Sequence, residues 1–176
     1  MPPPASPSTK QKLIQIPICK GLTEAEAEQI IAICEEQAAG KGQAIFREGD
    51  AGDGVYVVLE GTVEVTKRDS SGKEQSMARL SDGTVVGEMS LVSGDAARSA
   101  SVTATSDAKL LKISSSRFQA LLQKDSVAAL KMVNNLAQVM SRRILLMNEK
   151  VVELMEKGKR KEELADFQKV LANWAF

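Results

Sequence analysis

An acidic residue and an arginine mark the two ends of one short, glycine-containing segment. Glu88 follows Gly87, and Arg98 lies ten residues after Glu88. A carboxylate accepts hydrogen bonds from sugar hydroxyls, and the planar guanidinium of an arginine holds phosphate oxygens through its forked N–H donors. Glycine lets the backbone turn sharply and approach a ligand closely. The spacing therefore favours a ligand with a sugar hydroxyl at one end and a phosphate at the other.

A second interpretation of this pair remains open. Glu88 and Arg98 could form an ordinary surface ion pair, which contributes little to stability. The residues beside them favour an anion site, because a helical turn over 88–92 would direct free N–H groups toward an anion. Ser99 adds a hydroxyl, and the small side chain of Ala100 leaves its backbone N–H accessible.

Short strands punctuated by glycine must carry this segment. Nine of the twelve glycines lie from Gly42 to Gly94. Val63 and Val65 alternate with polar residues, which predicts a strand with one buried and one solvated face. Such strands at close spacing are typical of a β-barrel or jelly roll. We predict strands over 44–46, 55–59, 62–67, 75–80, 99–105 and 109–113.

Helical patterns flank the predicted barrel on both sides. Residues 1–9 are rich in Pro, Ser and Ala and predict a disordered tail, whereas 13–34 predicts helix with Thr23 as an N-cap. After the barrel, a short helix precedes a long helix that ends near Glu156, and 159–176 predicts a terminal amphipathic helix. Apolar residues recur along the long helix in steps of three or four, at Val133, Leu136, Met140, Ile144, Met147, Val151 and Leu154.

The segment that holds the acid and the arginine resembles the phosphate-binding cassette of cyclic nucleotide-binding domains. The matching residues are 86–91 and 98–102, with glycine, acid and arginine in the family's order. The family includes the bacterial catabolite activator protein and the regulatory subunits of cAMP-dependent protein kinase, and the resemblance covers residues 13–155. It implies an α+β fold, in which a β jelly-roll barrel is flanked by an N-terminal helical segment and a long C-terminal helix. The domain is then expected over 10–156, and the long helix at its C-terminal end is expected to act as a lid or as a dimer helix.

The resemblance also implies which residues bind a cyclic nucleotide, with cAMP expected and cGMP less favoured. The phosphate and ribose would contact Gly87, Glu88, Met89, Ser90, Arg98, Ser99 and Ala100, and the base pocket and lid would use Val65, Met77, Met147 and Asn148. Binding would tighten the cassette, move a hinge helix around 118–122 and close the long helix over the base. The chain would be a regulatory domain that signals by helix rearrangement to an output protein that the sequence does not identify.

The composition excludes several other classes of function. With 23 basic and 23 acidic residues the formal net charge is zero, so no strong field draws the chain to nucleic acid or to an anionic membrane. Histidine, the commonest general base and metal ligand, is absent, and Cys19 and Cys34 are too few for a four-cysteine cluster. We therefore expect neither an enzyme nor a bound cofactor or metal. No apolar run reaches membrane-spanning length and no signal peptide is evident, which predicts a cytoplasmic protein.

The sequence leaves the assembly and one competing function open. The apolar stripe of the long helix continues past the predicted barrel, and pairing with a second copy would cover it in a homodimer. Alternatively, the terminal helix folds back across Gly158 and covers the stripe within one chain. The residues after Gly158 are too few for a three-helix DNA-binding module. The competing function is a barrel that has lost its ligand and acts as a protein-interaction or structural module.

Overall fold

The computed structural model describes residues 7–92 and 97–158. Internal contacts divide the chain into two units, residues 1–136 and 137–176, and each is described by itself. The boundary falls inside the long helix. The domain predicted over 10–156 stays a prediction. The predicted terminal helix over 159–176 lies outside the described residues.

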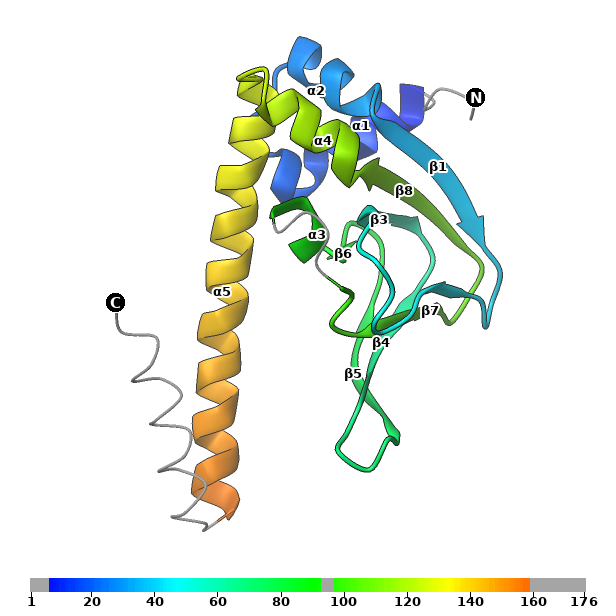
Figure 1. Ribbon diagram of the computed structural model, residues 1–176, viewed down its shortest axis with the longest axis vertical. Coiled ribbons are helices and arrows are strands. Elements are labelled where there is room, and N and C mark those ends of the chain that lie inside the picture. Colours follow the sequence, from blue (N-terminus) through cyan, green and yellow to red (C-terminus); the bar gives the residue numbers. More distant parts are fainter. Residues whose placement is uncertain (1–6, 93–96, 159–176) are drawn as a thin grey trace. The chain divides into compact units, whose positions relative to one another are not determined.

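Eight strands in the described part of the chain form two antiparallel sheets of four strands each (Figure 1). The predicted α+β fold, a β jelly-roll barrel with helices before and after it, is confirmed. The first sheet contains, in spatial order, β1 (Cys34–Ala39), β8 (Ala108–Ser114), β3 (Gly54–Glu60) and β6 (Val85–Val86). The second contains β2 (Ala44–Phe46), β7 (Ser101–Ala104), β4 (Val63–Arg68) and β5 (Glu74–Leu80).

Strands β1 and β6 were not among the predicted strands. The sequence analysis ended its first helical region at Cys34, which is instead the first residue of β1. Only the two ends of β1, Cys34 and Ala39, are buried, so this strand lacks the alternation by which strands are recognised. Strand β6 has two residues and is too short to show any periodicity.

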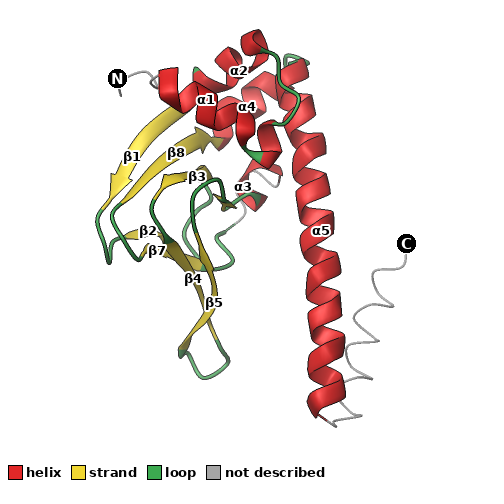
Figure 2. Ribbon diagram, turned by 180° about the vertical axis from the view of Figure 1, so that it is seen from behind, coloured by secondary structure: helices red, strands yellow, loops and turns green. Residues whose placement is uncertain are grey.

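Helices gather at one end of the strands, over the start of β1 and the end of β8 (Figure 2). Thr23 caps α2 (Glu24–Ile31) through the reciprocal pair of hydrogen bonds expected of a capping box. Its Oγ1 accepts from the N–H of Glu26 at 3.3 Å, and its own N–H donates to Glu26 Oε2 at 2.7 Å. The described helices are α1 (Pro7–Gln15), the 3-10 helix η1 (Pro17–Cys19), α2 (Glu24–Ile31), α3 (Met89–Val92), α4 (Ser115–Leu122) and α5 (Val127–Gly158).

Helix α1 corrects the predicted disordered tail. It begins at Pro7, so the prediction is wrong for residues 7–9, and residues 1–6 lie outside the described part of the chain. Thr9 is buried and its hydroxyl donates to the Glu36 carboxylate on β1. This contact and the buried side chain of Leu13 fix α1 against the sheet. Thr9 lies in the stretch whose Pro- and Ser-rich composition predicted disorder, whereas Leu13 lies in the predicted helical region.

The core lies on both faces of β3. Tyr56 and Val58 pack between the two sheets. Val55 and Val57 point to the opposite face, because side chains alternate along a strand. They are fully buried as well, since α3 and α4 contact the outer face of β3. The barrel is therefore joined to the helices through a second apolar layer.

The long helix α5 begins in the first unit. Ser126 Oγ accepts from the Ala129 N–H at 3.4 Å, in agreement with a predicted cap at Asp125 or Ser126. The side chains that this first stretch buries are Ala128, Ala129, Met132 and Leu136. Val133, which the predicted stripe included, is only half-buried. No helix of the described residues combines the length and apolarity needed to cross a membrane.

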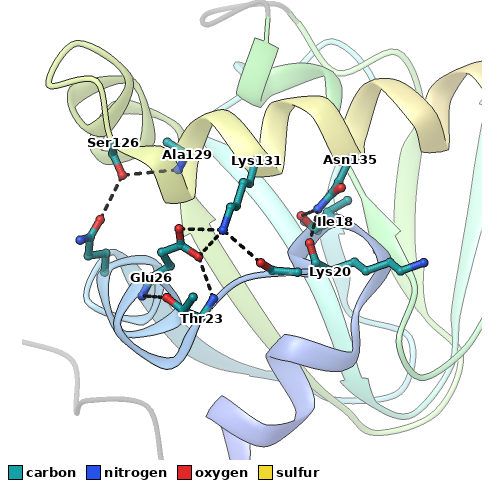
Figure 3. Close-up of polar contacts among 10 residues, drawn as sticks. Ile18, Lys20, Thr23, Glu26, Ser126, Ala129, Lys131 and Asn135 are labelled. Carbon is teal, nitrogen blue, oxygen red and sulfur yellow. Dashed lines mark hydrogen bonds and ion pairs between the residues drawn. The ribbon is translucent and has the colours of Figure 1, made fainter.

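A polar cluster fastens the first turns of α5 to the N-terminal helices (Figure 3). Lys131 Nζ donates to both carboxylate oxygens of Glu26 at 2.8 Å and to the Gly21 carbonyl at 3.2 Å. One turn later, Asn135 Nδ2 donates to the Lys20 carbonyl at 2.8 Å. We call these five residues the Lys131 cluster. It holds α5 to the chain that leads into α2.

Candidate functional site

The guanidinium of Arg98 is buried and held by three groups. Its side chain is 2% exposed. Nη1 donates to the Gly87 carbonyl at 3.2 Å and to Ser90 Oγ at 2.7 Å. Nη2 forms an ion pair with Asp53 Oδ1 at 2.9 Å. Arg98 is therefore not part of an ordinary surface ion pair, which was the alternative that the sequence left open.

Backbone hydrogen bonds bring Arg98 and Asp53 together across a long sequence separation. The Arg98 N–H donates to the Asp50 carbonyl at 2.8 Å, and the Gly49 N–H donates to the Arg98 carbonyl at 2.9 Å. The loop between β2 and β3 is thereby clamped to the residues that precede β7. The same loop carries Asp53 to the start of β3, so its carboxylate reaches the guanidinium.

Two aromatic rings support the guanidinium from the strands. Arg98 Cζ lies 4.2 Å from the centre of the Phe46 ring on β2 and 5.6 Å from that of Tyr56 on β3. Ring faces attract cations without using any N–H donor. The rings therefore support the guanidinium while leaving its N–H donors available for oxygen acceptors.

Gly87 is required at this site for two reasons. Its φ of +74° lies in the left-handed region, which confirms the predicted sharp turn. A Cβ at this position would also lie 2.3 Å from Arg98 Nη1. The space beside Gly87 is thus occupied by the arginine of the site, whereas the sequence analysis assigned that space to an approaching ligand.

Asp53 stands between two cations. Besides Arg98, it accepts a hydrogen bond from Lys112 Nζ on β8. Burial raises the pKa of Asp53. The hydrogen bond from Lys112 and the charges of Lys112 and Arg98 together lower it by more, so the pKa lies below its ordinary value. Burial likewise lowers the pKa of Lys112, and its bond to Asp53 more than restores it, so that this pKa is raised. Asp53 and Lys112 are therefore both charged at neutral pH.

One donor of the guanidinium has no acceptor. Within residues 7–92 and 97–158, Arg98 Nε is the one buried side-chain nitrogen or oxygen that lacks a hydrogen-bond partner. An unsatisfied buried donor costs about 1–3 kcal/mol, and more when it is charged. An oxygen of a phosphate or carboxylate would supply the missing acceptor. The site is therefore suited to bind an anion.

Helix α3 links this site directly to helix α4. The carbonyl of Ser90, whose hydroxyl contacts Arg98, accepts from Ser115 Oγ. The carbonyl of the next residue, Leu91, accepts from Gln119 Nε2 at 2.6 Å. Ser115 and Gln119 both belong to α4. A displacement of α3 that follows anion binding would therefore act on α4.

The remaining predicted phosphate and ribose residues lie next to this centre. Glu88 is half-buried at the turn that starts α3, and Met89 is 47% exposed. Ser99 is exposed and Ala100 is half-buried, immediately after Arg98. The structure thus brings Gly87, Ser90 and Arg98 into contact and places the other four beside them. Their contacts with a ligand stay predictions.

The predicted base-pocket residues do not form one cluster within either unit. Val65 is half-buried and packs against the core between the sheets. Met77, on the paired strand β5, is 62% exposed at an irregularity in the register. Met147 and Asn148 belong to the second unit, where both are exposed. Their predicted contact with the base stays a prediction.

Sequence reasoning missed four residues that build the site: Phe46, Asp53, Tyr56 and Lys112. A buried arginine requires an acidic partner, and only Glu88 was considered for that role. Asp53 follows a glycine within a turn-forming run between two strands, which is the one local signal that could have pointed to it. Nothing in the local sequence around Lys112 distinguishes it from other lysines on strands.

The comparisons with known proteins agree with an anion site of this kind. Residues 36–125 match the family model described as "Cyclic nucleotide-binding domain". The chain is 31% identical over 128 residues to the "Cyclic AMP receptor protein" of Thermus thermophilus, covering 73% of this chain and 57% of that protein. It is 36% identical over 110 residues to a "cAMP-dependent protein kinase regulatory subunit" of Yarrowia lipolytica, covering 62% of this chain and 28% of that one.

The fold is also similar to that of a solved structure. The crystal structure of Thermus thermophilus Catabolite Activator Protein superposes with a TM-score of 0.69 at 29% identity, over 78% of this chain and 62% of that chain. The chain thus spans less than two thirds of the length of each of these relatives. The family model, over residues 36–125, spans Arg98 and most of the barrel.

Proposed function

Because the chain belongs to the family of cyclic nucleotide-binding domains, we propose that it is a non-enzymatic sensor domain that binds a cyclic nucleotide at Arg98. The observation that carries this proposal is the buried guanidinium whose Nε lacks an acceptor among the described residues. The cyclic phosphate supplies that acceptor as a charge-assisted partner. We propose cAMP as the ligand in preference to cGMP, with the Glu88 carboxylate accepting a hydrogen bond from the ribose hydroxyl.

The signal leaves the site through α3. When a phosphate oxygen competes for Arg98, the bonds that Arg98 makes to Ser90 and Asp53 are weakened. Ser90 and Leu91 in turn accept hydrogen bonds from α4, so a shift of α3 moves α4. In this proposal α4 passes the change to α5, which closes over the base and presents a rearranged surface to an output protein.

One observation favours the competing function. Asp53 already neutralises Arg98, so the site has an internal anion and does not require a ligand for charge balance. A barrel that has lost its ligand would retain this pair.

Titration calorimetry of nucleotide-free protein with cAMP and with cGMP decides between the two functions. We expect heat and a raised melting temperature, with cAMP the tighter ligand; no response to either nucleotide at millimolar concentration would favour the barrel without a ligand.

The second unit supports a homodimer. Ile144 and Met147 of α5 are 40% and 65% exposed, and Leu145 and Leu146 are exposed between them. Pairing with a second copy would cover these side chains. Sedimentation of the purified protein should show a dimer that Ile144→Asp together with Met147→Asp converts to monomer. A monomer at all concentrations tested would favour the alternative, in which the terminal segment covers the helix.

A further inference from the structure

Lys112 gives Asp53 a second partner that depends on strand register. Lys112 lies opposite Tyr56 in the pairing of β8 with β3. Its Nζ is 5.8 Å from the centre of the Tyr56 ring, and it donates to Asp53 Oδ2. Arg98 takes the other oxygen, Oδ1. The two cations thus use separate oxygens of one carboxylate, and both lie close to the Tyr56 ring, at 5.6 Å and 5.8 Å from its centre.

Burial separates Lys112 from an ordinary surface lysine. Its side chain is 16% exposed, whereas that of Lys109 on the same strand is 69% exposed. Lys109 also pairs with a carboxylate, that of Glu60, but at the surface. A partly buried charge pair is screened less by water and salt than an exposed one. Loss of Lys112 would therefore remove a stronger charge interaction from Asp53 than loss of Lys109 would remove from Glu60.

Releasing Arg98 has a cost that depends on what Asp53 retains. If Arg98 were its only partner, turning the guanidinium toward a phosphate would leave the half-exposed Asp53 carboxylate without a charged hydrogen-bond partner, which is unfavourable. With Lys112 on the second oxygen, Asp53 remains paired after Arg98 turns away. The cation on β8 thereby lowers the free energy needed to free the arginine.

We propose that Lys112 is a positioning residue for phosphate binding, because it holds Asp53 and so releases Arg98 to the ligand. This inference rests on the proposed function. It assigns to β8 a part in ligand affinity although Lys112 need not touch the nucleotide. Asp53 acts as the restraint on Arg98, and Lys112 sets how strong that restraint is.

Calorimetry with cAMP on four proteins tests this role: wild type, Lys112→Met, Lys109→Met and Lys112→Arg. We expect Lys112→Met to weaken binding about tenfold, the size typical of a hydrogen bond between charged groups. Lys109→Met removes the same charge from the same strand and should bind like wild type. Lys112→Arg keeps the cation and should retain most of the affinity. Wild-type affinity in Lys112→Met would overturn the inference, whereas failure of wild type to bind would instead overturn the proposed function.

A double-substitution cycle separates action through Asp53 from a direct effect of charge. In an Asp53→Asn background the restraint is gone, so binding should be no weaker than in wild type and Lys112→Met should have no further effect. An equal loss from Lys112→Met in both backgrounds would show that Lys112 acts directly on the phosphate. A large loss from Asp53→Asn alone would show that Asp53 orients Arg98 for the ligand; either result overturns the inference. Should Lys112→Met fail to fold, Lys112→Gln keeps the stem and removes the charge, and the same expectations apply.

Discussion

Two clusters in the first unit each pair a cation with a carboxylate, yet they differ in what is left unsatisfied. In the Lys131 cluster the three donors of one ammonium meet three oxygen atoms, and the lysine side chain is 39% exposed. At the candidate site the guanidinium is 2% exposed, and its Nε has no acceptor in the described part of the chain. A satisfied cation joins two elements, whereas a buried cation with an unused donor has the capacity to bind a ligand.

The acids of the two clusters show the same difference in another form. The hydrogen bond from Lys131 lowers the pKa of Glu26 most, and the hydrogen bonds from Thr23 lower it less. Glu26 uses both of its carboxylate oxygens for the one cation Lys131. Asp53 instead divides its two oxygens between Arg98 and Lys112. A shared carboxylate can lose one cation and remain paired with the other. The candidate site can therefore rearrange without leaving its acid unpaired, whereas the Lys131 cluster cannot.

Removing the cation from each cluster should separate their roles most clearly. Arg98→Ala should weaken cyclic nucleotide binding about 100-fold, or ~2–3 kcal/mol, because charge-assisted bonds to phosphate are lost. Arg98→Lys should restore little, since the forked geometry is lost. Lys131→Met is the matched control: its melting temperature should fall by about 2–4 °C, with affinity unchanged. Similar affinities of Arg98→Ala and wild type in calorimetry would show that the site is assigned wrongly.

A methyl group at Gly87 tests whether the site depends on space beside the arginine. Gly87→Ala should lower the free energy of unfolding by about 2 kcal/mol, because Ala is strained at positive φ and its Cβ displaces the guanidinium. Gly72→Ala is the control, since Gly72 has a φ of +81° and a Cβ added there would meet no atom within 4 Å. It should cost about 1 kcal/mol. Urea unfolding of both variants measures the difference, and equal losses would mean that contact with Arg98 is unimportant.

Acid should remove the contribution of Asp53 to stability. Because the folded-state pKa of Asp53 is lowered, its stabilising contribution is complete above the ordinary pKa and is lost as the pH falls through the folded value. The stability difference between wild type and Asp53→Asn should therefore be constant above about pH 5 and shrink as the pH falls below it. We expect about 1 kcal/mol or less, since the Asp53 side chain is 55% exposed and its charge is screened. A difference that grows on acidification would contradict the lowered pKa.

The sequence predicted what lies in one contiguous segment. Gly87, Ser90 and Arg98 were identified together because their order along the chain carries the chemistry, and the glycine-spaced strands predicted the barrel. Asp53 and Lys112 reach the same place from other strands through pairing register, which no local pattern encodes. Strand β1 escaped prediction because its polar middle has no apolar alternation. Contacts between distant strands therefore account for most of what sequence reasoning could not supply.

Strand β1 pairs with β8 along its whole length, and this pairing places Cys34 opposite Ile113. Pairings between residues so distant in sequence form slowly, because a long loop must close before they are stabilised. During synthesis, a chain that has not yet emerged past β8 lacks Lys112 and cannot close the barrel. The Arg98 site is therefore complete only in a chain that includes β8, and a nucleotide bound there would stabilise the folded domain relative to chains that lack this strand.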